Sequence, residues 1–201
     1  IRSEQINPGR RLVPFIRIAA VLLLAFGLGW ASRYLPVKNE VPEPVVSQQN
    51  IFVPKGQVNQ IFLSDGTRIW LNSESRLTVP SMFTGAVREV KLDGEAFFEV
   101  AKDPGHPFRI NLNGQQIEVV GTSFNVRAYS GSNKIETTLQ TGCIHLKTEG
   151  QVTVLSPGEQ CVFAKSDRKL TVGKVDPVSF SSWKDGRFEF QNEDLLEVFK
   201  V

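Results

Sequence analysis

Residues 89–100 read EVKLDGEAFFEV. Apolar and polar residues alternate on both sides of Asp93-Gly94, and alternation over such short runs is typical of β-strands. An Asp-Gly pair between two alternating runs is a strong hairpin signal, because glycine adopts the positive φ that a tight turn needs. The stretch therefore predicts two antiparallel strands joined by a turn at Asp93-Gly94.

The same pattern extends in both directions from this stretch. Asp65-Gly66 separates an alternating run at 61–63 from another at 67–71, and further runs follow at 117–120, 123–128, 144–146, 152–154 and 170–172. No helical periodicity of useful length occurs between residues 51 and 180. Residues 51–180 are therefore predicted to form an all-β body, as a sandwich, a roll or a solenoid, with a core that contains Trp70, Phe98 and Phe124.

A charge-free apolar segment lies near the start of the chain, at residues 18–32. Extended to residues 12–35 it would measure roughly 36 Å as a helix, enough for a hydrocarbon layer of about 30 Å, with Arg17 and Arg33 reaching toward the headgroups. The sequence therefore predicts a single N-terminal transmembrane helix at 12–35. A cleaved signal peptide and a buried helix are the alternatives.

The charges around this segment predict its orientation. Four arginines precede or enter it, at positions 2, 10, 11 and 17, which makes residues 1–11 a cytoplasmic juxtamembrane stub and places the rest of the chain on the other side. Three prolines follow within residues 36–44. Residues 36–50 are therefore expected to be an extended, proline-rich linker.

The pattern changes again at the C-terminal end. Residues 187–191 alternate as a strand does, and Asn192 is a suitable N-cap for a helix whose apolar residues follow at helical spacing. Residues 181–201 are therefore predicted to begin a second, small α/β domain.

Few residues in the chain are suited to catalysis. It has two histidines and two cysteines, none in a metal-ligand spacing, and no nucleophile elbow or phosphate-binding loop. His106 is expected in a loop and His145 on the solvent face of a strand. Glu95 and Glu99 share one face of a strand, which suggests either a hydrolase carboxylate pair or, more simply, a solvated surface. We predict no catalytic, cofactor-binding or metal-binding residues.

Charge and cysteine content further limit the functional classes to which the chain could belong. The chain has 23 basic and 21 acidic residues, a net charge of +2, so a nucleic-acid-binding protein with a clustered basic face is not expected. An oxidising compartment would permit a disulfide between Cys143 and Cys161, but the sequence favours two separate thiols.

Several phrases of this chain, taken together and in order, carry a family resemblance. They are VPKGQ (53–57), LSDGTRIWLN (63–72), LDGEAFFEV (92–100), GTSFNV (121–126), PGEQ (157–160) and WKDG (183–186). The region from about residue 12 to residue 201 resembles the anchor and periplasmic region of FecR-like anti-sigma factors, in the form found in Bacteroidetes-type bacteria.

The resemblance implies a function. A segment preceding residue 1 would bind an extracytoplasmic-function sigma factor, and the helix would cross the bacterial inner membrane once, with the C-terminal part in the periplasm. The terminal domain would resemble the secretin/TonB N-terminal (STN) fold and contact the signalling domain of a TonB-dependent outer-membrane transporter, and an intramembrane protease would release the sigma-binding segment. Candidate partner-binding residues are Arg187, Phe188, Phe190, Leu195 and Leu196. The alternative function is a membrane-anchored periplasmic carbohydrate-binding module.

Overall fold

The computed structural model describes residues 13–33 and 47–187, with side chains in the first range for 18–31 and 33. The chain divides into two compact units, residues 1–45 and 46–201, which are described separately. Of the predicted site residues, Phe188, Phe190, Leu195 and Leu196 lie outside the described residues, as do the stub at 1–11, most of the linker and most of the predicted α/β domain.

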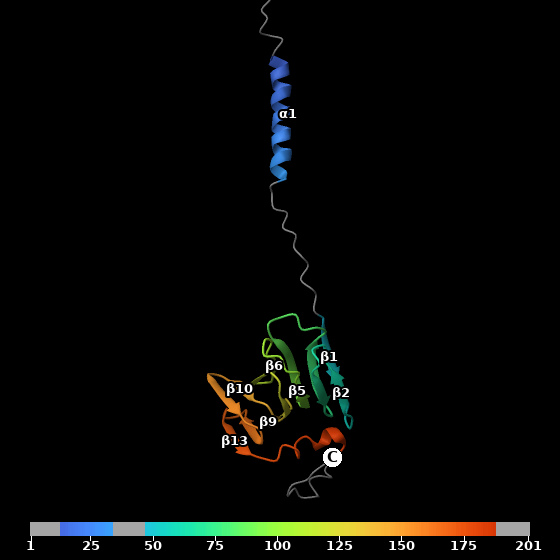
Figure 1. Ribbon diagram of the computed structural model, residues 1–201, viewed down its shortest axis with the longest axis vertical. Helices are drawn as coiled ribbons and strands as arrows, with labels where there is room; N and C mark the ends of the chain where they lie inside the picture. The colour runs from blue at the N-terminus through green and yellow to red at the C-terminus, as the bar shows by residue number, and fades with distance from the viewer. Residues whose placement is uncertain (1–12, 34–46, 188–201) are drawn as a thin grey trace, which may run out of the picture. The chain divides into compact units, whose positions relative to one another are not determined.

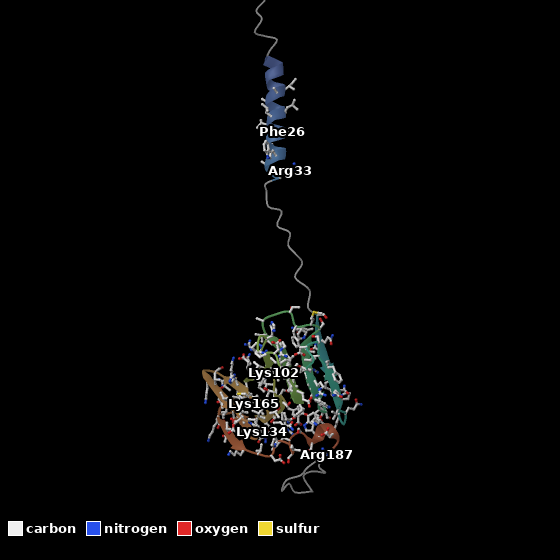
Figure 2. All side chains as sticks on the ribbon, in the orientation of Figure 1. Phe26, Arg33, Lys102, Lys134, Lys165 and Arg187 are labelled. Carbon is white, nitrogen blue, oxygen red and sulfur yellow. The ribbon has the colours of Figure 1, made fainter. Side chains whose placement is uncertain are left out.

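The first unit contains one helix, α1 (Val13–Ser32). It carries apolar side chains on all its faces, and the large ones are exposed, from Trp30 at 58% to Leu23 at 72% (Figure 2). Among the residues that the structure describes, no helix is both long and apolar enough to cross a membrane. The predicted helix is thus confirmed between shorter bounds than 12–35, and its membrane crossing stays a prediction.

The second unit is mainly β, as predicted. Its strands are β1 (Gln48–Phe52), β2 (Asn59–Phe62), β3 (Arg68–Leu71), β4 (Arg76–Pro80), β5 (Arg88–Glu99), β6 (Phe108–Asn111), β7 (Gln116–Val119), β8 (Ser123–Ala128), β9 (Lys134–Thr141), β10 (Ile144–Thr148), β11 (Gln151–Leu155), β12 (Glu159–Ala164) and β13 (Leu170–Lys174). A 3₁₀ helix, η2 (Ser182–Asp185), follows β13. The body begins at Gln48, within the range expected for the linker.

The strands form two sheets that share β5 and curl together into a half-barrel (Figure 1). The first sheet runs β1-β4-β5-β6-β7-β10-β11 and the second runs β2-β3-β5-β8-β9-β12-β13. All of these pairs are antiparallel except β5 with β6. The curled half-barrel confirms the predicted mainly β body.

The stretch around Asp93-Gly94 is a single strand and not the predicted hairpin. β5 pairs with β4 and β6 up to Asp93 and with β3 and β8 from Gly94 onward. Gly94 has a φ of +125°, and a Cβ atom there would lie 2.3–2.5 Å from atoms of Ser75. The glycine serves a bend and a close backbone approach, so the chain passes from one sheet to the other without reversing.

One hydrophobic core fills the concave side of both sheets. Phe98 lies at its centre, stacked on Phe124 with ring centroids 5.3 Å apart and 6.3 Å from Phe108. Phe98 and Phe124 are therefore core residues, as predicted. The prediction for Trp70 is wrong: its neighbours Ile69 and Leu71 are fully buried in the core, and the alternation of the strand turns Trp70 to the outer face.

A buried ion pair fixes the start of β5. Arg88 is 3% exposed and donates from Nη1 to Asp65 at 2.6 Å, and from Nε to the carbonyl oxygen of His106 at 2.7 Å. Asp65 also accepts from the hydroxyl of Thr67, inside the turn that joins β2 to β3. That turn is the Asp65-Gly66 hairpin predicted from sequence, and the ion pair ties it to the first sheet.

The two cysteines are not bonded to each other. Cys143 is exposed and Cys161 is buried. Burial raises the pKa of the Cys161 thiol to about 11. Of the two possibilities left by the sequence, the structure has separate thiols.

We expect Gly94→Ala to destabilise the body by roughly 3 kcal/mol, because the new methyl group would overlap Ser75 and the positive φ would strain an L-residue. Gly131→Ala is the matched control, since no atom lies within 4 Å of the Cβ added there. Denaturant unfolding of both variants measures the difference. Equal midpoints would contradict the assigned role of Gly94.

Candidate functional site

The outer face of the second sheet carries a continuous row of paired residues, which we call the transverse row. Strand pairing aligns its members across all seven strands of the sheet, in the order Gln60, Trp70, Phe97, Asn125, Thr138, Gln160 and Gly173. Phe97, Asn125 and Thr138, in the middle of the row, are 1%, 5% and 2% exposed. The central strands of this sheet are therefore buried on both faces.

The cover on this face includes the segment that follows β13, residues 175–187, which we call the strap. It begins where Val175 donates its N–H to the carbonyl oxygen of Gly158, just before β12. It then reaches η2, which lies on the side of the body occupied by β1 and β2 (Figure 1). The strap thus crosses the sheet.

Trp183 in η2 joins a polar network at the centre of the row. Its indole N–H donates to Oδ1 of Asn125 at 3.2 Å, and the amide of Asn125 donates to Oε1 of Glu95 at 3.0 Å. Asn72 donates to the other carboxylate oxygen of Glu95 at 3.0 Å. Trp183 is 8% exposed, so its hydrogen bond is shielded from water and fixes the orientation of the ring.

Lys184 makes the second contact between the strap and the outer face of the sheet. Its ammonium nitrogen lies 5.6 Å from the ring centroid of Trp70 and 5.4 Å from that of Phe97. These two rings contact each other edge to face at 5.9 Å. The strap is therefore held by the hydrogen bond from the indole of Trp183 and by the cation–π contacts of Lys184 with the rings of Trp70 and Phe97.

The strap ends in a defined turn. Gly186 takes a left-handed φ of 72° and closes η2 by donating to the carbonyl oxygens of Ser182 and Trp183. Arg187, the one predicted partner-binding residue that the structure describes, is exposed and lies 3.5 Å from Asp185 (Figure 2). The hydrogen bond from Lys184, with the charges of Lys184 and Arg187, holds the pKa of Asp185 below its ordinary value.

Glu95 and Glu99 do not form a catalytic pair. Glu95 is 7% exposed and accepts hydrogen bonds from the side-chain amides of Asn72 and Asn125, so the expectation of a solvated face is wrong at this position. Glu99 instead forms an ion pair with Arg68 at 2.5 Å, and Phe97 lies between the two glutamates along the strand. Each carboxylate is already paired, which leaves no positioned acid and base.

The histidines lie where the sequence predicted. His145 is exposed on β10, and His106 is exposed in the loop before β6, with Nδ1 2.8 Å from Asp103. That hydrogen bond lowers the pKa of Asp103. Within residues 13–33 and 47–187, no group of three or more His, Cys, Asp or Glu side chains could hold a metal ion.

Comparison with known proteins identifies the family. Residues 49–145 match the family described as FecR protein. Two crystal structures of a proposed anti-sigma factor from Parabacteroides distasonis, at 2.50 and 1.65 Å resolution, share 30% identity with the chain. The match to the first structure covers 76% of this chain and 71% of the other chain, with a TM-score of 0.71. The match to the second covers 75% of this chain and 71% of the other chain, with a TM-score of 0.70.

The chain belongs to the FecR family. This family is a regulatory, non-enzymatic kind of protein, and the resemblance seen in the sequence is confirmed. No curated protein matches the chain. The FecR match contains the strands of the transverse row from β2 to β9, and the strap lies beyond its end.

The sequence alone did not identify Asn72, Asn125, Trp183 and Lys184 as one site. All four lie within phrases that carry the FecR resemblance, at 63–72, 121–126 and 183–186, but no role could be assigned to them. Asn125 takes a regular polar position in the alternating strand at 123–128, and this pattern predicts a solvent-facing side chain. Its partner on the strap is 58 residues away, which no local pattern reveals.

We expect Asn125→Asp to weaken the site in a pH-dependent way, because a carboxylate would face Glu95 where the amide now donates. The two carboxylates would share a proton at higher pH than either alone, so the variant should regain stability as the pH falls from 7 toward 5. Thermal unfolding across this range measures the effect. A constant difference from the unsubstituted chain would contradict the direct contact.

Proposed function

We propose that the chain is a transmembrane anti-sigma factor. In this proposal, it relays the state of a TonB-dependent outer-membrane transporter across the inner membrane to an extracytoplasmic-function sigma factor. The observation that carries the proposal is the FecR match at residues 49–145, supported by the similarity to solved structures of a proposed anti-sigma factor. A sigma factor is the general partner that such a family implies.

The surface of α1 supports the membrane part of the proposal. Between Ile18 and Ala31 the helix carries no charged residue, and its large apolar side chains are exposed on every face. A helix that is apolar all round needs an apolar environment, and a lipid bilayer provides one. The four arginines that precede or enter this segment favour a cytoplasmic N-terminus and a periplasmic β-body.

The strap supports the relay part. A regulator without catalytic chemistry can respond only if binding at one place changes the state of another. Trp183 and Lys184 fix the exit of the chain at Arg187 against the rigid centre of the second sheet. We therefore propose that the region beginning at Arg187 receives the transporter's signalling domain, and that this docking controls stepwise proteolysis ending within the membrane.

The outer-face geometry favours this function over a carbohydrate-binding module. Such a module would present flat, exposed aromatic rings to sugar. Trp183 is 8% exposed and Trp70 is half-buried, with the Lys184 ammonium 5.6 Å from its ring centroid. Both rings serve contacts within the chain.

The native cysteines allow a test of topology. A membrane-impermeant maleimide added near neutral pH to cells with a permeabilised outer membrane should label Cys143, which is exposed, and spare Cys161, which is buried with a raised pKa. Cys143→Ser should abolish the signal. Labelling that requires disruption of the inner membrane would contradict a periplasmic body.

Removal of residues 187 onward tests the relay. The inducer of the transporter should then no longer change sigma-dependent transcription, whichever way the basal level moves. Gly131→Ala serves as the control and should respond normally, since its site is open. Normal induction in the shortened protein, with an unchanged pattern of membrane fragments on immunoblots, would overturn the proposed relay.

A further inference from the structure

Strand β2 is an open edge of the second sheet. Among the described strands it pairs only with β3. Leu63, just after β2, donates its N–H to the carbonyl oxygen of Thr67 at 2.9 Å, and the bonded positions of an antiparallel pair alternate along the strand. Gln60 and Phe62 therefore direct their backbone groups away from β3, and the carbonyl oxygen of Val58 is directed away as well.

Three side chains follow this free edge on the outer face of the sheet. Register pairs Gln60 with Trp70, which places Gln60 on the outer face. Val58 and Phe62 lie two residues to either side of Gln60, so alternation places them on the same face. Phe62 is 69% exposed, Val58 is 45% exposed, and no charged residue occurs between them. The edge thus presents an apolar, polar, apolar order that reads the same in both directions.

The edge strand of the first sheet, β1, lacks this symmetry. Its outer face carries Gln48, Asn50 and Phe52, so it is apolar at one end only. Asn50 is already hydrogen-bonded within the sheet, and the guanidinium of Arg76 lies 5.8 Å from the ring centroid of Phe52. Among the described residues, no aromatic ring or cation stacks on Phe62. Of these two edges, only β2 is complementary to a second copy of itself.

We propose that β2 pairs antiparallel with β2 of a second copy, about a two-fold axis that passes beside Gln60. In this register Gln60 faces Gln60 of the second copy, and Phe62 faces Val58 at each end. The N–H groups of Gln60 and Phe62 in each copy donate to the carbonyl oxygens of Gln60 and Val58 in the other. The same patch serves both copies, so the contact closes as a dimer. This inference goes beyond the proposed function and requires neither a sigma factor nor a transporter.

Cross-linking of engineered thiols tests the pairing. The 201-residue chain is kept in a mild detergent, because α1 exposes its apolar faces, and Cys143→Ser removes the exposed native thiol. Gln60→Cys then places a thiol beside the two-fold axis, where opposed Cα atoms lie about 5.5 Å apart, within disulfide range. It should form a covalent dimer at least about tenfold faster than the control Val152→Cys, because pairing raises the effective concentration of the thiols. Val152 is 61% exposed on β11, and equal rates at the two positions would overturn the proposal.

A mixture of two variants tests the register. Val58→Cys and Phe62→Cys chains, both with Cys143→Ser, should cross-link to each other because the two positions are opposed. Either variant alone should cross-link far more slowly, since its thiols would lie four residues apart along the paired strands, about 13 Å. A mixture that reacts no faster than the separate variants would rule out the proposed register.

A charge at the edge separates this contact from association through α1. Phe62→Asp should abolish cross-linking through Gln60→Cys, because a carboxylate would enter each apolar end of the interface. Phe52→Asp, at a phenylalanine 53% exposed on β1, is the matched control and should leave the rate unchanged. Since Phe62 is 69% exposed, its replacement should also leave the unfolding temperature unchanged. Undiminished cross-linking in the Phe62→Asp chain would contradict the proposal.

Discussion

The whole β-body depends on one strand serving two sheets. β5 pairs with four other strands, two on each side of Gly94, and the close approach of Gly94 to Ser75 is what allows the chain to bend between them. Because alternation continues unbroken through the bend, Val90, Leu92, Ala96 and Phe98 all face the same core. The buried pair of Arg88 and Asp65 then fixes the beginning of this strand to the β2–β3 turn.

The two sheets differ in what covers their outer faces. In the first sheet the outer face is a solvated network in which Glu118 accepts from both Lys147 and Arg109, and these hydrogen bonds lower the pKa of Glu118. In the second sheet the strap covers a small aromatic and amide cluster that is separate from the main core. This face binds a segment of its own chain closely and so fixes where the strap leaves the body at Arg187.

Local patterns in the sequence predicted the strands and the Asp65-Gly66 hairpin, because alternation and turn chemistry are properties of neighbouring residues. The same reasoning failed at Asp93-Gly94, since a glycine with positive φ suits a bend within a strand as well as a turn. The alternation of side chains along the strand places Trp70 on the opposite face from Ile69 and Leu71. It does not show which of the two faces is directed at the core. Trp70 and Glu95 were misplaced because their outer-face partners lie far along the chain: Lys184 lies over the ring of Trp70, and Asn72 and Asn125 donate to Glu95.

The strap has a practical meaning for where this domain ends. The FecR match stops at residue 145 and the last strand of the body stops at Lys174, yet Trp183 and Lys184 still complete its surface. A chain shortened to Lys174 would leave Trp70 and Phe97 uncovered and open to aggregation. During synthesis the same surface stays uncovered until the strap has emerged, so this face of the domain is completed only after its last strand.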